Sequence, residues 1–223
     1  METRRLGGTS IEVTPIGLGC MRFAGTGIVE RVYPSLDEQT VRSVVQAALD
    51  GGVTWFDTAE MYGHGGSERA VTSALRALGV APGGVRIATK WAPLFRRAAS
   101  ITKTIDARLA ALQGYPVDLH QIHMPTGGFS SIRAQVEAMA GLCEAGKVNA
   151  VGVSNFSARQ MELAHDVLSA RGIELASNQV QVSLLHRNIE RNGVLRAARR
   201  LGVTLIAFSP LRMGLLTGKF HAD

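Results

Sequence analysis

The chain has 223 residues, of which 46% are hydrophobic and 19% charged, with 24 Lys and Arg against 18 Asp and Glu. This composition excludes a disordered chain, and the length suffices for one domain with a large buried core. The net charge of +6 comes from scattered basic pairs, without the basic stripe and interleaved aromatics of a single-strand binder, so we expect no nucleic-acid partner.

Two cysteines, Cys20 and Cys143, lie far apart without CxxC spacing. No apolar stretch resembles a signal peptide, and none reaches the roughly 18 residues that cross a bilayer. We therefore expect a cytoplasmic protein with reduced thiols and no membrane partner.

A β-hairpin is predicted first, over residues 4–13, with its turn at Gly7-Gly8-Thr9 and a place over one end of the fold. Short apolar runs then alternate with longer helical patterns. The runs predict strands over residues 16–21, 53–57, 85–91, 117–123, 150–153, 177–182 and 203–208. The patterns between them predict helices over residues 36–49, 67–78, 101–112, 132–145, 158–170 and 190–201.

Several helix ends carry their own signals. Ser67 with Glu68 predicts the start of the second helix, and Gly79 predicts its end. Gly146 and Gly202 predict the ends of the fourth and sixth helices in the same way.

Unbroken apolar strands are typical of parallel sheets covered by helices on their faces, and the alternation of strand and helix indicates the α/β class. The near-constant spacing of the strand ends favours a closed (β/α)8 TIM barrel over an open doubly wound sheet, which stays the alternative. No linker divides the chain, so residues 1–223 are predicted to form a single barrel domain.

In such a barrel the active site lies where the strands end. Asp57, Lys90 and His123 occupy three of these positions, and Tyr62 follows in the loop after Asp57. Taken singly, each has an ordinary structural explanation: a cap, a solvated lysine, a satisfied histidine or a packing tyrosine. Together they indicate a site, because Lys90 would be buried without a partner unless Asp57 faced it.

These four side chains suit proton transfer to a carbonyl oxygen. A tyrosine has an ordinary pKa near 10, so Tyr62 needs a cation such as Lys90 to stabilise its phenolate. Asp57 would keep Lys90 charged, and His123 could donate a hydrogen bond that polarises the carbonyl. An aldolase that uses Lys90 as a Schiff-base amine is a different possibility, disfavoured because Asp57 would hold that amine charged.

Other common motifs are incomplete or missing. Gly17-Leu18-Gly19 is not extended to GxGxxG, and the glycine-rich segment 63–67 lacks the P-loop lysine. Ser154 is not in a nucleophile elbow, and the His and Cys residues give no zinc spacing. The sequence therefore predicts no metal site, and any dinucleotide would be bound outside a Rossmann fold.

Motifs along nearly the whole chain resemble the aldo-keto reductase family. They are Gly17-Leu18-Gly19-Cys20-Met21, the run from Phe56 to Gly63, Ala88-Thr89-Lys90, Asp118 to His123, Gly152 to Phe156, Asn178 to Gln181, Phe208 to Leu211, and Gly214 to Lys219. The last two are most similar to the subgroup of potassium-channel beta subunits and bacterial general stress reductases.

The resemblance implies NADPH-dependent reduction of an aldehyde or ketone to an alcohol, with a small-molecule carbonyl substrate. It makes Tyr62 the general acid, Lys90 and Asp57 its activating pair, and His123 the group that orients the substrate. It also implies that an aromatic ring at position 208 stacks on the nicotinamide and that the segment after it follows the pyrophosphate. The cofactor-binding residues it implies are Met21, Asp57, Ser154, Asn155, Gln179, Phe208, Ser209, Pro210, Leu211 and Lys219.

The family pattern continues beyond residue 223, so the resemblance implies an incomplete, C-terminally truncated barrel with about seven of its eight strands and weakened NADPH binding. Self-association or complementation at the open barrel edge is then expected. A redox-sensing, cofactor-binding regulatory subunit and an inactive fragment of the reductase are the alternatives. Segment 24–34 is a candidate lid, and Phe23, Trp91 and Met124 are candidates for the substrate wall or for packing.

Overall fold

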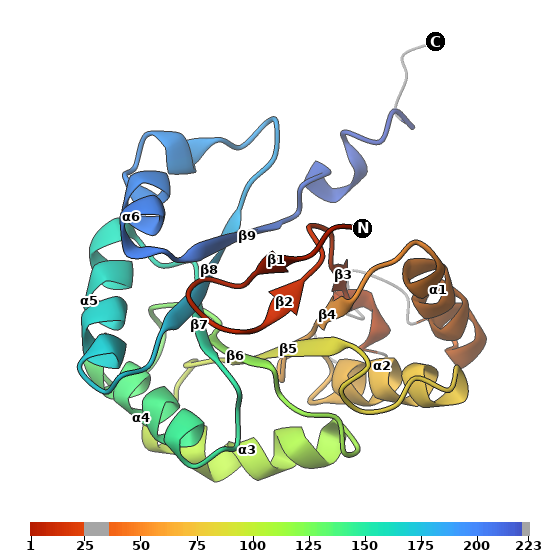
Figure 1. Cartoon of the computed structure of the whole chain (residues 1–223), viewed down its shortest axis with the longest axis horizontal. Coiled ribbons are helices and arrows are strands. Elements are labelled where there is room, and N and C mark those ends of the chain that lie inside the picture. The colour runs from red at the N-terminus through yellow and green to blue at the C-terminus, as the bar shows by residue number, and fades with distance from the viewer. Residues whose placement is uncertain (25–35, 220–223) are drawn as a thin grey trace.

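The computed structural model describes residues 1–24 and 36–219, so the predicted lid lies, apart from Ala24, outside the described residues. Seven parallel strands in the described ranges form one curled sheet in sequence order (Figure 1). They are β3 (Leu18–Gly19), β4 (Trp55–Asp57), β5 (Arg86–Trp91), β6 (Leu119–Ile122), β7 (Val151–Ser154), β8 (Leu175–Gln181) and β9 (Thr204–Phe208). This topology confirms the predicted α/β class and its barrel-like curl.

The helices lie outside the curve of the sheet, and each connects consecutive strands (Figure 1). They are α1 (Glu38–Asp50), α2 (Gly66–Ala77), α3 (Ala99–Ala111), α4 (Ile132–Glu144), α5 (Ala158–Ser169) and α6 (Val194–Leu201). Short 3-10 turns occur at Met21–Phe23, Asn188–Glu190 and Arg212–Gly214. All six predicted helices are confirmed, with ends that differ by a few residues.

Side-chain capping explains where three of the six described α-helices begin, namely α1, α4 and α5. Ser157 and Gln160 form a reciprocal capping box at the start of α5, and Ser131 accepts a hydrogen bond from an amide in the first turn of α4. α2 begins at Gly66, one residue before the predicted start, but Ser67 does not cap it: the residue before the helix is Gly65, which has a φ of 88°, and no side chain caps the helix. The Ser67 hydroxyl instead donates to the carbonyl of Cys20 at 2.6 Å.

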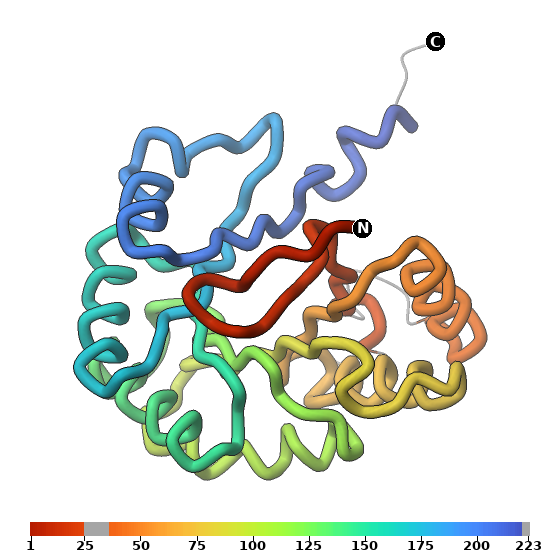
Figure 2. The backbone as a smooth tube through the Cα atoms, viewed as in Figure 1, coloured from red at the N-terminus to blue at the C-terminus, as the bar shows by residue number. Residues whose placement is uncertain are grey.

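The predicted N-terminal hairpin is also present, formed by β1 (Arg4–Arg5) and β2 (Glu12–Val13). Figure 2 shows this segment, in red, lying across the centre of the curled sheet. The Gly7 amide donates to Thr204 Oγ1 at 2.7 Å, which ties the hairpin to the start of β9. Gly7 has a φ of 59°, and a Cβ there would lie 2.6 Å from the Ala176 carbonyl oxygen, so only glycine fits.

Two separate hydrophobic clusters follow from this arrangement. The larger cluster lies between the sheet and the helices that cover it. The smaller cluster lies inside the curl, where hairpin side chains pack on residues of the strands: Leu6, Ile11, Val13, Trp55, Ala88, Leu119, Ala150, Ala176 and Ile206. The hairpin thus closes the interior at the end where the strands begin, and the opposite end stays open.

The two outer strands, β3 and β9, each pair with a single neighbour among the described residues. A closed barrel would join such strands to one another. The described part of the chain therefore forms a curled seven-stranded sheet, as the strand count from the sequence predicts.

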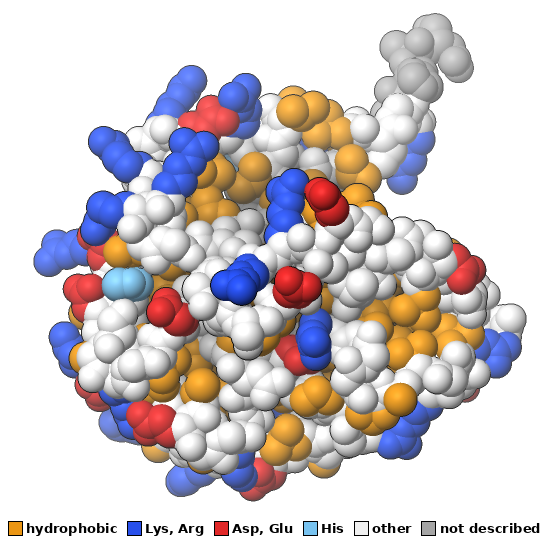
Figure 3. Space-filling model, viewed as in Figure 1, with side chains coloured by type: hydrophobic (Ala, Val, Ile, Leu, Met, Phe, Trp, Pro, Cys, Tyr) orange, Lys and Arg blue, Asp and Glu red, His pale blue; other side chains and the backbone are white. Residues whose placement is uncertain are grey.

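Charged side chains are distributed over the surface, with acidic groups among the basic ones on the face drawn in Figure 3. Several of them form ion pairs between neighbouring helices, such as Arg171 with Glu144 and Arg200 with Glu162. Exposed pairs of this kind contribute about 0–1 kcal/mol each. No helix within the described ranges combines the length and the apolar character that crossing a membrane requires.

Candidate active site

A cavity of about 960 Å³ opens at the end of the sheet where the strands stop. Ligand sites in α/β barrels lie at this end because the loops after the strands converge there. Loops after β3, β4, β5, β6, β7 and β9 line the cavity together with one face of α3. Three of the four predicted catalytic residues are among its lining residues, namely Asp57, Tyr62 and His123.

The fourth, Lys90, lies directly behind this wall with no exposed surface. Its ammonium group donates to Asp57 Oδ2 at 2.6 Å and to the carbonyl of Thr58 at 2.8 Å. Gln121 Nε2 lies 3.2 Å from the other oxygen of Asp57. Burial is the largest single effect and favours the neutral amine, but the charge and hydrogen bond of Asp57, together with the nearby Tyr62 and Cys20, outweigh it and raise the pKa of Lys90. Lys90 is therefore held as a cation, as its position in the sequence required.

Tyr62 places its ring between this cation and His123. Lys90 Nζ lies 5.4 Å from the centroid of the Tyr62 ring, and the His123 ring meets the same ring edge-on, with centroids 5.8 Å apart. Burial raises the pKa of Tyr62, and this effect exceeds the opposing one of Lys90. The sequence predicts that the cation sets the pKa of this phenol, whereas in the structure burial has the larger effect. The phenol is thus protonated at neutral pH, which is the form that a general acid needs.

His123 is neutral in this environment. Burial, followed by the nearby charge of Lys90, lowers its pKa to about 4. A neutral imidazole has one donor and one acceptor nitrogen. The Nδ1 atom of His123 has no hydrogen-bond partner among the described residues, and Asn155 Nδ2 donates to its backbone carbonyl at 3.2 Å. Because His123 lines the cavity, its neutral ring can offer an N–H group to an oxygen there.

The loop between β4 and α2 positions Tyr62 by close backbone packing. Cβ atoms on Gly63 and Gly66 would each lie 2.3 Å from the carbonyl oxygen of Ala24, so both positions require glycine. Thr58 Oγ1 donates to Ser67 Oγ at 2.8 Å, which extends the hydrogen bond from Ser67 to Cys20. The loop is thereby fixed against the segment that follows β3.

The opposite wall of the cavity is formed by the ends of β7, β8 and β9. The Ser154 hydroxyl and the backbone amide of Asn155 both donate to the backbone carbonyl of Gln179, at 2.9 and 2.8 Å. Asn155 has a φ of 62°, a left-handed conformation that turns its side chain back toward Ser154 Oγ, 3.0 Å away. The predicted cofactor residues that line the cavity are Met21, Asp57, Ser154, Asn155, Gln179, Phe208 and Ser209.

Three predicted cofactor residues lie elsewhere. Pro210, Leu211 and Lys219 belong to the exposed segment after β9 and are not among the residues that line this cavity. Their assignment to a cofactor stays a prediction.

The cavity also has a side that the sequence argument did not identify, formed by the β4–α2 loop, the β5–α3 loop and α3. Its residues are Glu60, Met61, His64, Ala92, Leu94, Arg96, Thr104, Ala107 and Arg108. Met124, a candidate wall residue, does line the cavity, whereas Phe23 and Trp91 are buried in the outer hydrophobic cluster. Strand ends are visible in the sequence, but the face of α3 that turns toward the cavity is not.

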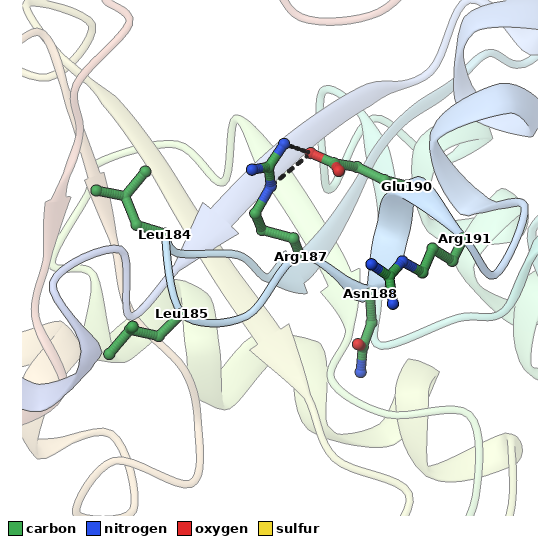
Figure 4. Close-up of a pocket in the computed structure, with 6 residues that line it drawn as sticks. All are labelled: Leu184, Leu185, Arg187, Asn188, Glu190 and Arg191. Carbon is green, nitrogen blue, oxygen red and sulfur yellow. Dashed lines mark hydrogen bonds and ion pairs between the residues drawn. The ribbon is translucent and has the colours of Figure 1, made fainter.

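A second, smaller pocket of about 400 Å³ lies in the long loop between β8 and α6 (Figure 4). Its polar side chains are partly used within the loop, since Arg187 pairs with Glu190 at 2.8 Å. Leu184 and Leu185 contribute the apolar side of the pocket (Figure 4). None of the predicted site residues lies there, so the larger cavity is the candidate active site.

Together, the curled parallel sheet and the cluster of tyrosine, lysine, aspartate and histidine at its strand ends define an α/β protein of the barrel type with a site suited to proton transfer. Comparison with known proteins agrees: the family described as "Aldo/keto reductase family" matches residues 15–223. The chain belongs to the aldo/keto reductase family.

Two curated relatives are about a third identical to this chain. Aldo-keto reductase YhdN from Bacillus subtilis (strain 168) is 37% identical over 231 residues, covering 100% of this chain and 66% of that protein. The chloroplastic pyridoxal reductase of Arabidopsis thaliana is 33% identical over 224 residues, covering 96% and 61% respectively. The chain thus spans a little less than two thirds of the length of these relatives.

Solved structures show the same fold. The thermostable aldo-keto reductase Tm1743, in complex with the inhibitor epalrestat, matches with a TM-score of 0.81 and 29% identity, covering 98% of this chain and 76% of that one. A glycerol dehydrogenase from Gluconobacter oxydans matches with a TM-score of 0.82 and 32% identity, covering 99% and 67%. These neighbours support the barrel prediction; the similarity to one subgroup of the family stays a prediction.

Proposed function

We propose that this chain carries the catalytic site of an NADPH-dependent reductase that converts an aldehyde or ketone to an alcohol. The observation that carries the proposal is the arrangement around Tyr62. A protonated, partly buried phenol lies close to both a buried ammonium and a neutral imidazole, and the phenol and the imidazole line one cavity. Such a group can protonate an oxygen that gains negative charge.

The wall formed by β7, β8 and β9 suits a planar ring that bears an amide. The side-chain amides of Asn155 and Gln179 line the cavity, and so does the ring of Phe208. Gln179 lines the cavity, and its side-chain amide makes no hydrogen bond to the residues that the structure describes, so it is available to a ligand. We assign nicotinamide binding to this wall, with Ser154, Ser209 and Met21 beside it; the bound dinucleotide supplies a hydride.

Tyr62 then provides the proton. Its O–H bond breaks as the carbonyl oxygen of the substrate accepts the proton and becomes the hydroxyl of the alcohol. The phenolate that remains is stabilised by the ammonium of Lys90, 5.4 Å from the ring centroid. Asp57 keeps this ammonium charged and oriented through its 2.6 Å contact.

His123 would act on the same oxygen before the proton moves. Its low pKa keeps it neutral above pH 5, so it donates a hydrogen bond without competing as an acid. The low dielectric of a largely buried site strengthens such a hydrogen bond. His123 thus fixes the direction from which a carbonyl approaches Tyr62.

The aldolase alternative is disfavoured by the state of Lys90. A Schiff-base lysine must reach its substrate as a neutral amine. Here the amine is buried, bonded to Asp57 and Thr58, and charged. The regulatory alternative uses the same cavity, and steady-state turnover with simple aldehydes separates it from the reductase.

The decisive experiment compares wild type with Tyr62→Phe. Oxidation of NADPH by an aldehyde panel should fall by about a hundredfold or more in Tyr62→Phe, the usual contribution of general acid catalysis, with NADPH fluorescence binding unchanged. Tyr115→Phe is the matched control, because Tyr115 is a buried tyrosine that bonds the carbonyl of Val80 away from the cavity. Equal turnover in wild type and Tyr62→Phe would refute the proposal.

A further inference from the structure

The loop that carries Tyr62 has no regular secondary structure between Asp57, the last residue of β4, and Gly66, where α2 begins. Its shape therefore depends on individual contacts. The Gly65 amide donates to the carbonyl of Glu60 at 3.2 Å, and the Tyr62 amide donates to the carbonyl of Ala59 at 3.0 Å. Glu60 thus begins the short turn that encloses Tyr62.

Glu60 also joins this loop to the strand that carries Lys90. Its backbone amide donates to the carbonyl of Lys90 at 3.1 Å. Its side-chain Oε1 accepts the amide of Ala92 at 2.7 Å. Glu60 therefore contacts the backbone at Lys90 and again two residues after it, which places the tyrosine loop relative to the strand that carries the lysine.

A third contact fixes Glu60 from outside the strand. The guanidinium of Arg96 pairs with the Glu60 carboxylate, with side-chain exposures of 26% and 11%. Arg96 is itself held by Thr104 Oγ1 at 2.9 Å and Ser100 Oγ at 3.0 Å, and it lies 5.2 Å from the Trp91 ring. The Ala92 amide on Glu60 and the three contacts of Arg96 restrain this ion pair to one geometry, whereas an exposed ion pair has no such restraint.

This set of contacts does more than add stability. The approach of Tyr62 to Lys90 and His123 is a matter of a few ångströms, and proton transfer is sensitive to displacements of about 1 Å. Glu60 lies two residues before Tyr62, and its carboxylate meets α3 through Arg96 and β5 through Ala92. Loss of these contacts would release the turn from the neighbouring elements, although none of the four predicted catalytic residues would be changed.

We infer that Glu60 is a positioning residue, which with Arg96 clamps the turn bearing Tyr62 onto the end of β5 and sets its contact with His123. Its effect on catalysis rests on the proposed carbonyl reduction, whereas its effect on geometry does not. Neither the family match nor the named relatives assign this role.

The test measures the position of Tyr62 without cofactor or substrate. In Glu60→Ala the turn should loosen and expose His123, so the pKa of His123 should rise from about 4 toward the ordinary 6.5. Histidine ring NMR resonances, assigned with His123→Gln, report this pKa. Glu60→Gln keeps an acceptor for the Ala92 amide and should shift the pKa less. Under the proposed function, kcat of Glu60→Ala should fall about tenfold to a hundredfold, with KM less affected.

The matched control is Glu144→Ala, which removes the carboxylate of the Glu144–Arg171 pair on the helical surface and should leave His123 unchanged. Should Glu60→Ala fail to fold, Glu60→Asp keeps the charge but shortens the reach and serves in its place. A folded Glu60→Ala or Glu60→Asp variant whose His123 titrates as in wild type would overturn the inference. Absence of carbonyl reduction in wild type would refute the proposed function and leave this result intact.

Discussion

The two ends of the curled sheet bury different kinds of side chain. Where the strands begin, the hairpin fills the interior with apolar groups such as Leu6 and Val13. Where the strands stop, the structure buries Lys90 and a largely enclosed tyrosine and histidine around an open cavity. One end gains free energy by excluding water, and the other spends part of it to hold charged and polar groups in fixed positions.

Backbone strain follows the same division. Among the described residues other than glycine, seven have positive φ values. Six of them lie in segments that follow a strand, including His64, Asn155 and Ser209 around the cavity. Each such conformation costs about 1–2 kcal/mol. Strain therefore gathers at the end with the candidate active site, which is typical of functional regions.

The largest difference between the two ends is expected on substitution of Lys90. Lys90→Met should abolish the proposed activity, by a factor of about a hundred to ten thousand, and lower the free energy of unfolding by about 3–5 kcal/mol, because Asp57 loses its partner. The double variant Lys90→Met with Asp57→Asn should recover much of the stability and none of the activity. Urea unfolding and NADPH oxidation measure the two effects. Recovery of activity in the double variant would contradict the role of the ion pair.

The hairpin end should respond in the opposite way. Leu6 is 3% exposed, so Leu6→Ala should cost about 2–5 kcal/mol of unfolding free energy and leave kcat unchanged. Ile16→Ala is the control, since Ile16 is 62% exposed and should change stability by less than about 0.5 kcal/mol. Denaturant unfolding and initial reaction rates, measured on the same samples, give the unfolding free energy and kcat. A kcat loss in folded Leu6→Ala would show that the two ends are coupled.

A smaller effect, on the pH dependence of stability, is expected from His120 in β6 and from His123 just after it. His120 is buried on the outer side of β6, and burial lowers its pKa to about 4. Its folded pKa is below the unfolded value near 6.5, so the unfolded state binds more protons and stability should fall as pH drops from 6.5 to 4. The slope is at most about 1.4 kcal/mol per pH unit for each histidine, and His123 adds to it.

Replacing His120 with Gln should reduce the slope of stability against pH by the contribution of one histidine, while activity at neutral pH is kept. Urea melts between pH 4 and 7 give the slope for wild type, His120→Gln and His123→Gln. An unchanged slope in both variants would contradict the burial of neutral imidazoles.

Much of this arrangement could be predicted because strand ends leave a clear mark in the sequence. A lysine after an unbroken apolar run needs a buried partner, and the neighbouring strand supplies Asp57. Tyr62 and His123 are predicted from their positions, because Tyr62 lies in the loop after a strand and His123 lies at a strand end. The sequence could not weigh burial against charge, and so it overstated the effect of Lys90 on the pKa of Tyr62.

Other features depended on contacts between distant segments. The Glu60–Arg96 pair joins two irregular loops, which no periodicity relates. Ser67 matches a helix-capping residue in type, but its hydroxyl is committed to the carbonyl of Cys20. Side chains with several possible partners are decided by the tertiary structure, so local patterns identify the residue and not its contact.

The bond between Gly7 and Thr204 spans 197 positions along the chain. During synthesis the hairpin would leave the ribosome long before β9, its partner, exists. The interior of the curl can therefore close only after most of the sheet has been assembled, and contacts of such high sequence separation slow folding. The order of events expected in refolding is helices and neighbouring strands first, and docking of the hairpin last.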